Sequence, residues 1–474
     1  MSAAGRGPLE LAREALAGAP AWLVGGAVRD RLLGRATGDL DLAVGGDVET
    51  AARTLARAAR AAVFPLSEAF GAWRVVDRGG DWQADLSPLG GATIEADLAQ
   101  RDFTVNAIAE PLAGGEPIDP TGGLSDLAAR RLRMVAASAF ASDPLRVMRL
   151  PRFACELELA PEPATRAAAA QEAARLRDVA QERVFAELRR VVGAPDPLRG
   201  LELMAEIGAT AAVLPELEAL RGVEQSRYHH LDVHDHTLAV LAETVAIERD
   251  PGALFGAAHG ERLRALLAAP FSDELTRGTA LRFGALLHDI AKPQTRGELE
   301  DGRVTFFDHD RQGAELSRAI LTRLRTSERL RAHVAALARN HLRLGFLVHE
   351  RPLSRRQVHA YLRACQPVEV DVSLLSVADR LATRGRKAEE AIAKHLELAR
   401  ELIGPALAWE AGERPAPLVR GDELADALAL ARGPRIGELL AELEAAQYAG
   451  EVTTREQAVA HARRLLDAPP APGG

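Results

Sequence analysis

The chain has 474 residues and 47% hydrophobic content, which suffices for about three domains of ordinary size rather than one small core. It has neither an apolar run of about 18 residues nor a basic N-terminal segment followed by an apolar run, so we expect no membrane span, no signal peptide and a cytoplasmic protein. The net charge of −8 argues against a protein that holds nucleic acid by overall charge, and the distant Cys155 and Cys365, without CxxC spacing, argue against a disulfide framework or a zinc ribbon.

The first part of the chain has the pattern of an α/β domain. Up to Pro120, short apolar runs such as residues 21–24 and 73–76 alternate with glycine-rich turns and one alanine-rich helical stretch over residues 49–62. From Leu124 onward strand signals almost vanish, and Ala, Leu, Glu and Arg recur at helical spacing. We therefore predict an α+β chain with an α/β head followed by an all-α body.

Proline- and glycine-rich stretches mark the predicted domain boundaries, and one of them runs from Gly404-Pro405 through Pro415-Ala416-Pro417. The Pro/Gly-rich end of the chain is expected to be disordered. The predicted divisions are a head over residues 1–130, a helical domain over 131–225, a histidine-bearing helical domain over 226–403, a helical tail over 404–468 and a disordered end over 469–474.

A glycine pair and two aspartates form the strongest local pattern in the head. Side chains two residues apart on a strand point to the same face, so Asp39 and Asp41 would project side by side. Such hard oxygen ligands favour Mg²⁺. The preceding Gly25-Gly26 turn lets backbone N–H groups approach a triphosphate without a Cβ in the way, and Arg29 adds a charge-assisted contact. Together these parts suit nucleotidyl transfer by in-line attack at phosphorus.

Each half of this pattern alone has a plainer explanation. A Gly-Gly pair is commonest as an ordinary turn, and an Asp-x-Asp is more often a solvated strand end. Asp85, in an apparent strand over residues 82–86, is either a third carboxylate of the site or an ordinary strand-end aspartate. The joint order and spacing of the glycine pair and the two aspartates favour the functional interpretation.

Further motifs in the same order give the chain a family resemblance. The Gly-Gly-x-x-Arg-Asp and Asp-x-Asp elements are followed by the motif-bearing segments 97–107 and 142–153. This order resembles the tRNA nucleotidyltransferase and poly(A) polymerase family, specifically the bacterial class that includes CCA-adding enzymes. The resemblance implies a polymerase-β-like nucleotidyltransferase head followed by a helical body. It also implies that Arg101, Asp102 and Asn106 contact the ribose and triphosphate.

Segment 142–153 resembles the family's nucleotide-selecting helix, which implies that Asp143, Arg146, Arg149 and Arg152 face the incoming nucleotide. A carboxylate can accept from the exocyclic amino group of C or A while an arginine donates to the ring acceptor beside it, whereas U and G present carbonyls there. Asp143 and Arg146 would thus select CTP and ATP. Asp143 is also expected to be the N-cap of the helix that follows, with Pro144 in its first turn.

Two positions depart from the family's pattern. Gln100 stands where the family usually has an arginine, which bears on a triphosphate contact. Ser142 stands where the family usually has a glutamate, which bears on the details of base selection. The departures leave the aspartate pair unchanged. By contrast, the later helix over residues 181–188 matches the family and is interpreted as structural, because its apolar residues form a stripe.

Histidines in the second half follow the order of a metal-binding domain. The pattern H…HD…D resembles the HD superfamily of metal-dependent phosphohydrolases. Neutral imidazole and carboxylate ligands on separate helices suit Mg²⁺, Mn²⁺, Fe or Ni²⁺ rather than a structural zinc site. His309 and His341 either extend the site to two metals or only support it, and the domain either hydrolyses phosphoesters or only braces the RNA. The candidate ligands of the pattern are His236, His288, Asp289 and Asp379.

The last part of the chain bears on the substrate. Residues 418–452 resemble the C-terminal tRNA-contacting region of CCA-adding enzymes, with one helix expected to start at Gly433-Pro434 and to end at Gly450. Residues 131–199 carry 12 arginines against 9 acidic residues, which provides a local basic segment for RNA. We therefore expect the chain to add CMP and AMP from CTP and ATP to the 3′ end of tRNA, with Mg²⁺ at the aspartate pair.

Other functions are compatible with parts of the sequence. Within the same chemistry, the chain could be a poly(A) polymerase or an enzyme that adds only CC or only A. In a different class, the HD domain could carry the main activity as a phosphohydrolase. A non-catalytic RNA-binding regulator is disfavoured, because two like charges held side by side without use cost stability. No oligomeric state is predicted.

Overall fold

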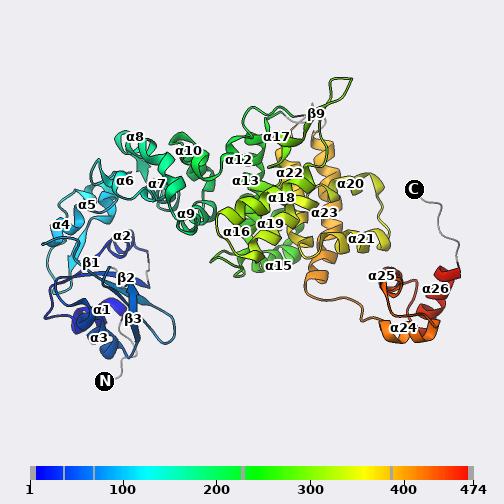
Figure 1. Ribbon diagram of the computed structural model, residues 1–474, viewed down its shortest axis with the longest axis horizontal. Coiled ribbons are helices and arrows are strands. Elements are labelled where there is room, and N and C mark those ends of the chain that lie inside the picture. The colour runs from blue at the N-terminus through cyan, green and yellow to red at the C-terminus, as the bar shows by residue number, and fades with distance from the viewer. Residues whose placement is uncertain (1–6, 36–37, 68–69, 226–229, 385–387, 468–474) are drawn as a thin grey trace. The chain divides into compact units, whose positions relative to one another are not determined.

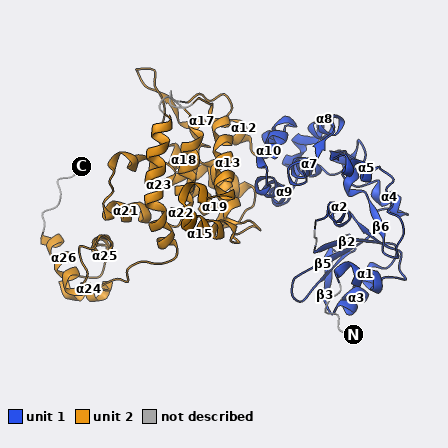
Figure 2. Ribbon diagram, turned by 180° about the vertical axis from the view of Figure 1, so that it is seen from behind, with its two compact units in different colours: residues 1–213 blue, residues 214–474 orange. Residues whose placement is uncertain are grey.

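The chain folds into two compact units (Figure 2). Unit 1 covers residues 1–213 and unit 2 covers residues 214–474. The predicted disordered end over residues 469–474 lies outside the described residues, and the finer division into four folded domains stays a prediction. No described helix is both long and apolar enough to cross a lipid bilayer. The computed structural model describes residues 7–35, 38–67, 70–225, 230–384 and 388–467.

Unit 1 begins with a six-stranded sheet in the order β3-β4-β5-β2-β1-β6. Its strands β1, β2 and β3 are labelled in Figure 1. β2 and β5 are parallel, and the other neighbouring strands are antiparallel. Sheet and helices together confirm the predicted α/β head. The strands are β1 (Ala21–Val24), β2 (Asp39–Val44), β3 (Ala62–Ser67), β4 (Ala72–Val76), β5 (Gln83–Pro88) and β6 (Ala109–Pro111). The head helices are α1 (Pro8–Ala15), α2 (Gly26–Leu32), α3 (Val48–Ala59), α4 (Ile94–Leu98) and the 3₁₀ turn η1 (Thr104–Asn106).

Alternation along β2 sends its residues to two different faces of the sheet. Leu40 and Leu42 are buried in the core to which α1 and α3 contribute. Ala43 faces the other way and lies in a second core with residues of α4. Asp39 and Asp41 share this second face at the start of the strand, where both are open to solvent. The predicted projection of the two aspartates on one face is therefore confirmed.

The rest of unit 1 is helical, as expected. One short ladder was not predicted: β7 (Arg131–Leu132) pairs with β8 (Ala160–Pro161). Strands of two residues are too short to show alternation in a sequence. The helices are α5 (Gly123–Ala128), α6 (Ala139–Ser142), α7 (Arg146–Glu156), α8 (Pro163–Glu172), η2 (Ala173–Asp178), α9 (Gln181–Gly193), α10 (Pro197–Glu206) and α11 (Ala209–Val213).

Unit 2 is a helical bundle with one small hairpin, formed by β9 (Arg296–Glu298) and β10 (Val304–Phe306). The hairpin was not predicted either, and its strands have only three residues each. Cys155 in unit 1 and Cys365 in unit 2 are both buried free thiols, as expected. The helices are α12 (Pro215–Glu218), α13 (Val233–Arg249), α14 (Gly252–Phe255), α15 (Ala257–Ala268), α16 (Arg277–Leu287), α17 (Lys292–Thr295), α18 (His309–Arg323), α19 (Glu328–Asn340), α20 (Arg343–Leu347), η3 (Val348–Glu350), α21 (Arg355–Cys365), α22 (Glu369–Ala382) and α23 (Ala388–Glu410).

The tail consists of α24 (Gly421–Leu428), α25 (Pro434–Ala449) and α26 (Arg455–Asp467). α25 starts and ends as predicted, with Pro434 at its first position and Gly450 in the left-handed conformation at its end. The boundary stretch expected from Gly404-Pro405 through Pro417 was placed too early, because α23 continues through its first residues to Glu410 and the connection to α24 follows only there. Ile403, Ala406 and Leu407 are buried, and this packing holds the helix together across a proline that would otherwise break it.

Candidate functional sites

A cavity of about 350 Å³ in unit 1 brings together the predicted residues of the head site, with the exception of Asp143. It lies at the start of β2, where the aspartates emerge, and at the turn between β1 and α2. Residues from α7 complete its wall. The predicted residues that line it are Gly25, Gly26, Arg29, Asp39, Asp41, Arg101, Asp102, Asn106, Arg146, Arg149 and Arg152.

Asp41 has the electrostatic environment of a cation ligand. Its carboxylate opens to the cavity but is surrounded by protein on its other sides, and this burial raises the pKa of Asp41, as does the nearby charge of Asp85. Arg101 and Arg29 act in the opposite direction but do not compensate fully. A divalent cation beside Asp41 and Asp39 would stabilise both carboxylates, so the residues present fit the predicted magnesium site.

The backbone conformation and the neighbouring side chains both require glycine at position 25. Its φ of 66° lies in the left-handed region, which side chains other than glycine rarely adopt. A Cβ at this position would lie 2.9 Å from Nη1 of Arg101 and 3.5 Å from Oδ2 of Asp41. The turn therefore brings bare backbone directly against Asp41, and the approach of a triphosphate to this backbone stays a prediction.

A buried chain of polar side chains holds the arginines of the cavity in place. Nη1 of Arg29 donates to Oδ1 of Asn106 at 2.5 Å, and Nδ2 of Asn106 donates to Oδ1 of Asp102 at 3.0 Å. Oδ2 of Asp102 lies 3.0 Å from Nε of Arg149, close enough for an ion pair although the two groups are not aligned as a hydrogen bond. Asp102 and Asn106 thus position Arg29 and Arg149. A direct contact of either with ribose or triphosphate stays a prediction.

Three arginines surround the ring of Phe153. The guanidinium carbons of Arg29, Arg149 and Arg152 lie 5.0, 5.4 and 4.1 Å from the ring centroid. Arg152 is nearly fully buried, and this burial lowers the pKa of Arg152 to about 10. Its charge is held by Glu187, whose Oε2 accepts from Nη1 of Arg152 at 2.6 Å.

Sequence reasoning missed two members of this site. Glu187 lies on α9, whose apolar stripe of Val184, Phe185 and Leu188 is buried as predicted. An acidic residue beside such a stripe is the signal that could have indicated a buried ion pair. Arg190, one turn further along, lines the cavity and donates to both oxygens of Glu156 at 2.7 and 2.9 Å.

The proposed base-selecting pair is arranged differently from the expectation. Arg146 lines the cavity, and its Nη2 donates to the carbonyl of Gln100 at 2.9 Å. Asp143 is not part of the cavity wall, and its Oδ2 lies 3.5 Å from Nη2 of Arg183. Asp143 is also not the N-cap of α7, because that helix begins at Arg146 after a turn. The carboxylate of Asp143 accepts from the N–H of Leu145 instead.

The two departures from the family's pattern lie around Arg146. Nε2 of Gln100 donates to the carbonyl of Gly90 at 2.5 Å and thereby fixes the loop before α4. Ser142 Oγ donates to the carbonyl of Ala139 at 2.9 Å and lies 3.4 Å from Nη1 of Arg146. Of the two departures, only Ser142 contacts Arg146 through its side chain, whereas Gln100 holds Arg146 through its backbone carbonyl. Gln100 and Ser142 do not line the cavity themselves.

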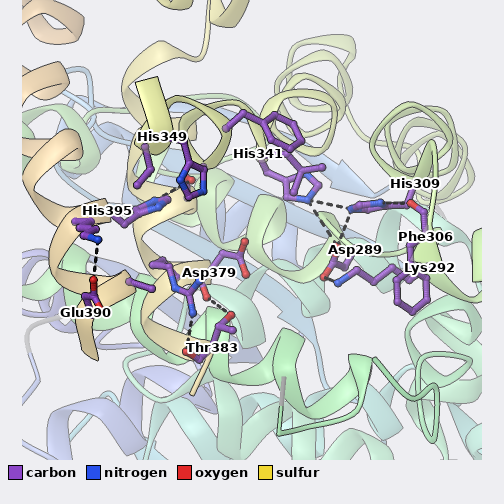
Figure 3. Close-up of a pocket in the computed structure, with 18 residues that line it drawn as sticks. Asp289, Lys292, Phe306, His309, His341, His349, Asp379, Thr383, Glu390 and His395 are labelled. Atoms are coloured by element: carbon purple, nitrogen blue, oxygen red, sulfur yellow. Dashed lines mark hydrogen bonds and ion pairs between the residues drawn. The ribbon is translucent and has the colours of Figure 1, made fainter. Parts of the chain in front are cut away.

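A second site lies in unit 2, where four histidines surround Asp289. Figure 3 shows two of them, His309 and His341, beside Asp289. Its Oδ2 is 3.1 Å from Nε2 of His288 and 3.8 Å from Nε2 of His236. Nε2 of His236 is also 3.0 Å from Oδ1 of Asp379. The structure thus brings together the four residues of the H…HD…D pattern.

His309 and His341 join the same cluster from the other side of Asp289. Their Nε2 atoms lie 3.4 and 3.7 Å from its Oδ1. Ligand atoms of His236, His288 and Asp289 lie within 4.8 Å of one another, and so do those of Asp289, His309 and His341. The arrangement therefore offers two overlapping sets of metal ligands that share Asp289.

The imidazoles are oriented as metal ligands. Nδ1 of His288, His309 and His341 lies 2.8, 2.6 and 2.7 Å from the backbone carbonyl three residues earlier. Donation of the Nδ1 proton to a carbonyl leaves the Nε2 lone pair for a metal. Nε2 of His288 and Oδ1 of Asp289 are buried without a hydrogen-bond partner. Such buried atoms need a partner, so the residues fit a divalent metal.

Several residues of this second site were not predicted. Nζ of Lys292 lies 2.6 Å from Oδ2 of Asp289. Burial alone would raise the pKa of Asp289, but His288 and Lys292 hold it well below its ordinary value, so the carboxylate is ionised. Arg380, Lys394 and His395 line the adjoining cavity of about 660 Å³. Their role could not be predicted because they carry no motif.

Models of known protein families match three parts of the chain. The "Poly A polymerase head domain" matches residues 21–82 and 81–133. The "Probable RNA and SrmB-binding site of polymerase A" matches residues 158–220, and the "HD domain" matches residues 233–384.

Two relatives match nearly the whole chain. The chain is 37% identical over 454 residues to the A-adding tRNA nucleotidyltransferase of Deinococcus radiodurans, covering 94% of this chain and 96% of the relative. It is 34% identical over 447 residues to the CC-adding tRNA nucleotidyltransferase of Thermus thermophilus, covering 92% of each.

Solved structures show the same fold at lower identity. A CCA-adding enzyme in apo form is 19% identical, with a TM-score of 0.65 and coverage of 98% of this chain and 94% of that chain. The Thermotoga maritima CCA-adding enzyme complexed with tRNA is 19% identical, with a TM-score of 0.60 and coverage of 97% and 94%. Because two near-full-length relatives, the head model and the HD model all match it, the chain belongs to the family of tRNA nucleotidyltransferases that carry an HD domain.

Proposed function

We propose that this chain adds CMP and AMP to the 3′ end of tRNA, taking them from CTP and ATP and releasing pyrophosphate. The observation that carries the proposal is the position of Asp39 and Asp41 on one face of β2, in the wall of a cavity that six arginines and the glycine pair Gly25-Gly26 also line. The two near-full-length relatives are both named for nucleotide addition to tRNA.

Asp39 and Asp41 would hold Mg²⁺, which would supply Lewis acidity for the attack of the RNA 3′-hydroxyl on the α-phosphate. Gly25 keeps the turn beside Asp41 free of side chains, so that phosphate oxygens can approach the backbone. Arg101 and Arg149 are exposed enough on the cavity wall to contact the triphosphate, while Asp102 fixes the direction of Arg149. No covalent intermediate is needed, since positioning and charge supply the catalysis.

The choice of nucleotide needs its own test, because the two near-full-length relatives differ. One is named A-adding and the other CC-adding, at similar identity and coverage. A partial enzyme that adds only A or only CC is therefore the second candidate function. Arg146, held by the carbonyl of Gln100, is the residue of the proposed base-selecting pair that lines the cavity.

Two tRNA substrates decide among these functions. One lacks the whole CCA end, and the other ends in CC, and each is incubated with CTP alone, ATP alone and both. A full CCA-adding enzyme extends the first with CTP and the second with ATP. A CC-adding enzyme fails on the second, and an A-adding enzyme fails on the first. Long runs of A on any RNA, with no C incorporated, would contradict the proposal in favour of a poly(A) polymerase.

We also propose that the cluster around Asp289 binds one or two divalent metals, of which Mg²⁺, Mn²⁺, Fe and Ni²⁺ suit its ligands, and that it hydrolyses phosphoesters. The converging Nε2 atoms and the buried, unpartnered Oδ1 of Asp289 support the metal site. A metal held by these residues would supply Lewis acidity for the hydrolysis of a phosphoester. Lys292 and Arg380 would bind the phosphate oxygens at the cavity wall.

Two variants separate the activities of the two sites. Asp41→Ala should abolish nucleotide addition and leave the metal content of unit 2 and its phosphoesterase activity unchanged. Asp289→Ala should reduce the metal content, measured by plasma mass spectrometry, and abolish hydrolysis of p-nitrophenyl phosphate, while nucleotide addition continues. If instead Asp289→Ala abolished the principal activity and Asp41→Ala did not, the HD domain would be the main enzyme.

A further inference from the structure

We propose that Phe64 is a stacking platform for an unpaired base at the 3′ end of the RNA substrate, on the same sheet face as the catalytic aspartates. This inference rests on the proposed nucleotide addition, because it assigns a place to the RNA end that is being extended. Nothing in the motifs of the sequence indicates it. It follows from the register of four neighbouring strands.

One lateral row crosses the sheet from the metal site to its edge. Asp41 on β2 is opposite Asp85 on β5, Asp85 is opposite Arg74 on β4, and Arg74 is opposite Phe64 on β3. Residues directly opposite one another on paired strands project from the same face. Three strand spacings put Phe64 about 14 Å from Asp41. That distance is within reach of a short single-stranded RNA end.

Burial confirms which face the row occupies. The neighbouring row consists of Leu40, Ala84, Val75 and Val63, and all four contribute to the core on the side of α1 and α3. Since alternate residues point to opposite faces, Phe64 must lie on the face of the aspartates. In the same row, Arg74 donates to Asp85 at 2.6 and 2.7 Å.

The apolar side chain of Phe64 is exposed at the edge of the sheet, and this exposure needs an explanation. It is 44% exposed on β3, which is the edge strand of the sheet. Leu66 on the same strand is 43% exposed, and Phe70 just beyond it is 78% exposed. Pro65 and the bulge between Pro65 and Ser67 protect the backbone of this edge against pairing with another strand. The apolar side chains nevertheless stay exposed together, and such a patch indicates a binding surface.

The side chains of the row from Asp41 to Phe64 indicate which kind of ligand binds there. At one end, the aspartates and their metal would take the reacting 3′-hydroxyl. Arg74 neutralises Asp85, so the negative charge ends there and an aromatic face follows. A single-stranded RNA end has the matching composition, because its charged backbone carries planar bases that stack on aromatic side chains.

The incoming nucleotide is expected on the opposite side of Asp41. Arg29 and Asn106, which belong to the cavity, lie on α2 after β1 and on η1 before β6. β1 and β6 follow β2 in the sheet on the side away from β5. The side of β5, β4 and β3 is therefore left for the RNA end, and stacking there would accept any base.

Steady-state kinetics on wild type and Phe64→Ala test the platform. In Phe64→Ala we expect the KM for tRNA lacking its CCA end to rise about tenfold, because one base–aromatic stack is lost. The KM for CTP and ATP and kcat should stay within about twofold. Phe64→Trp should restore the KM for tRNA, because it keeps an aromatic face. The matched control is Phe307→Ala, which removes an exposed aromatic ring of unit 2.

Direct binding separates this inference from the proposed function. A fluorescent single-stranded RNA ending in CC is titrated with wild type and both Phe64 variants, and weaker binding by Phe64→Ala alone supports the platform. If wild type added no nucleotide to any tRNA end, the proposed function would fail, and this titration would still decide the platform.

Two results would overturn the platform. The first is equal RNA binding and an equal KM for tRNA in wild type and Phe64→Ala. The second is a wild-type dimer, measured by sedimentation, that Phe64→Ala dissociates, because β3 would then be an interface between two copies of the chain.

Discussion

Asp41 and Asp85 lie opposite one another on the parallel strands β2 and β5, and Arg74 on β4 holds Asp85 through two hydrogen bonds. The charge of Asp85 is the second largest cause, after burial, of the raised pKa of Asp41. Asp85 is thus an electrostatic neighbour of Asp41, and its guanidinium partner Arg74 limits how strongly it acts. Whether it also binds metal stays a prediction.

Asp85→Asn should extend nucleotide addition to more acidic conditions. Asp41 must be ionised to bind a cation, and its raised pKa means that this ability is lost as the pH falls through that pKa. Removing the Asp85 charge lowers the pKa of Asp41, so the acidic limb of the kcat/KM profile at limiting Mg²⁺ should move to lower pH. Asp81→Asn, in the exposed turn before β5, is the control and should leave the limb in place. A limb that moved to higher pH would show that Asp85 is itself a metal ligand.

Gly25→Ala and Gly34→Ala separate backbone strain from loss of the site. Both glycines have positive φ, 66° and 70°, a backbone conformation that alanine adopts only with strain. A Cβ at Gly34 meets no atom within 4 Å, whereas at Gly25 it lies 2.9 Å from Arg101. We expect Gly25→Ala to lower kcat/KM about 100-fold and Gly34→Ala to leave it nearly unchanged. Equal losses of kcat/KM in the two variants would assign the effect to strain alone.

The elements predicted from the sequence are those that carry local patterns. The carboxylates Asp39 and Asp41 follow from strand alternation, and the cluster around Asp289 follows from the order of a known motif. Both predictions depend on short segments whose residue types can be recognised one segment at a time.

The contacts that were missed join segments far apart in sequence. Arg152 and Glu187 are 35 residues apart, and nothing in either segment indicates the other. The pairing of Arg74 with Asp85 depends on the register of two strands, which a sequence does not display. At Gly404-Pro405 the sequence predicted a break where the structure has a continuous helix. Tertiary packing of α23 outweighs the local tendency of proline to end a helix.

Glu187→Ala should destabilise unit 1 far more than the loss of an exposed ion pair. The Arg152–Glu187 side chains are only 9% and 11% exposed, so removing the carboxylate leaves a buried guanidinium without its main partner. We expect a loss of about 3–5 kcal/mol in the free energy of unfolding. Glu206→Ala breaks a pair with Arg166 at 3.0 Å whose side chains are 38% and 52% exposed, and should cost less than about 1 kcal/mol. Urea unfolding measures both, and comparable losses would contradict a buried role for Glu187.

Glu369→Gln should stabilise unit 2 in a pH-dependent manner. Glu369 is 2% exposed and its Oε2 has no hydrogen-bond partner, and burial raises the pKa of Glu369 to about 7 from an ordinary value of 4.5. Because the pKa of Glu369 is higher in the folded state than in the unfolded state, ionisation of its carboxyl lowers the free energy of unfolding. This loss is absent below pH 4.5, grows between pH 4.5 and 7, and is complete above pH 7.

Glutamine stays neutral at every pH, so the variant should gain on the order of 3 kcal/mol over wild type above the raised pKa and almost nothing below the ordinary one. Urea unfolding of wild type and Glu369→Gln at acidic and alkaline pH measures the gain. Glu261→Gln, at an exposed position of α15, is the control and should show no such dependence. A gain that is equal at both pH values would mean that Glu369 is destabilising through its shape or its unmet hydrogen bond rather than through its charge.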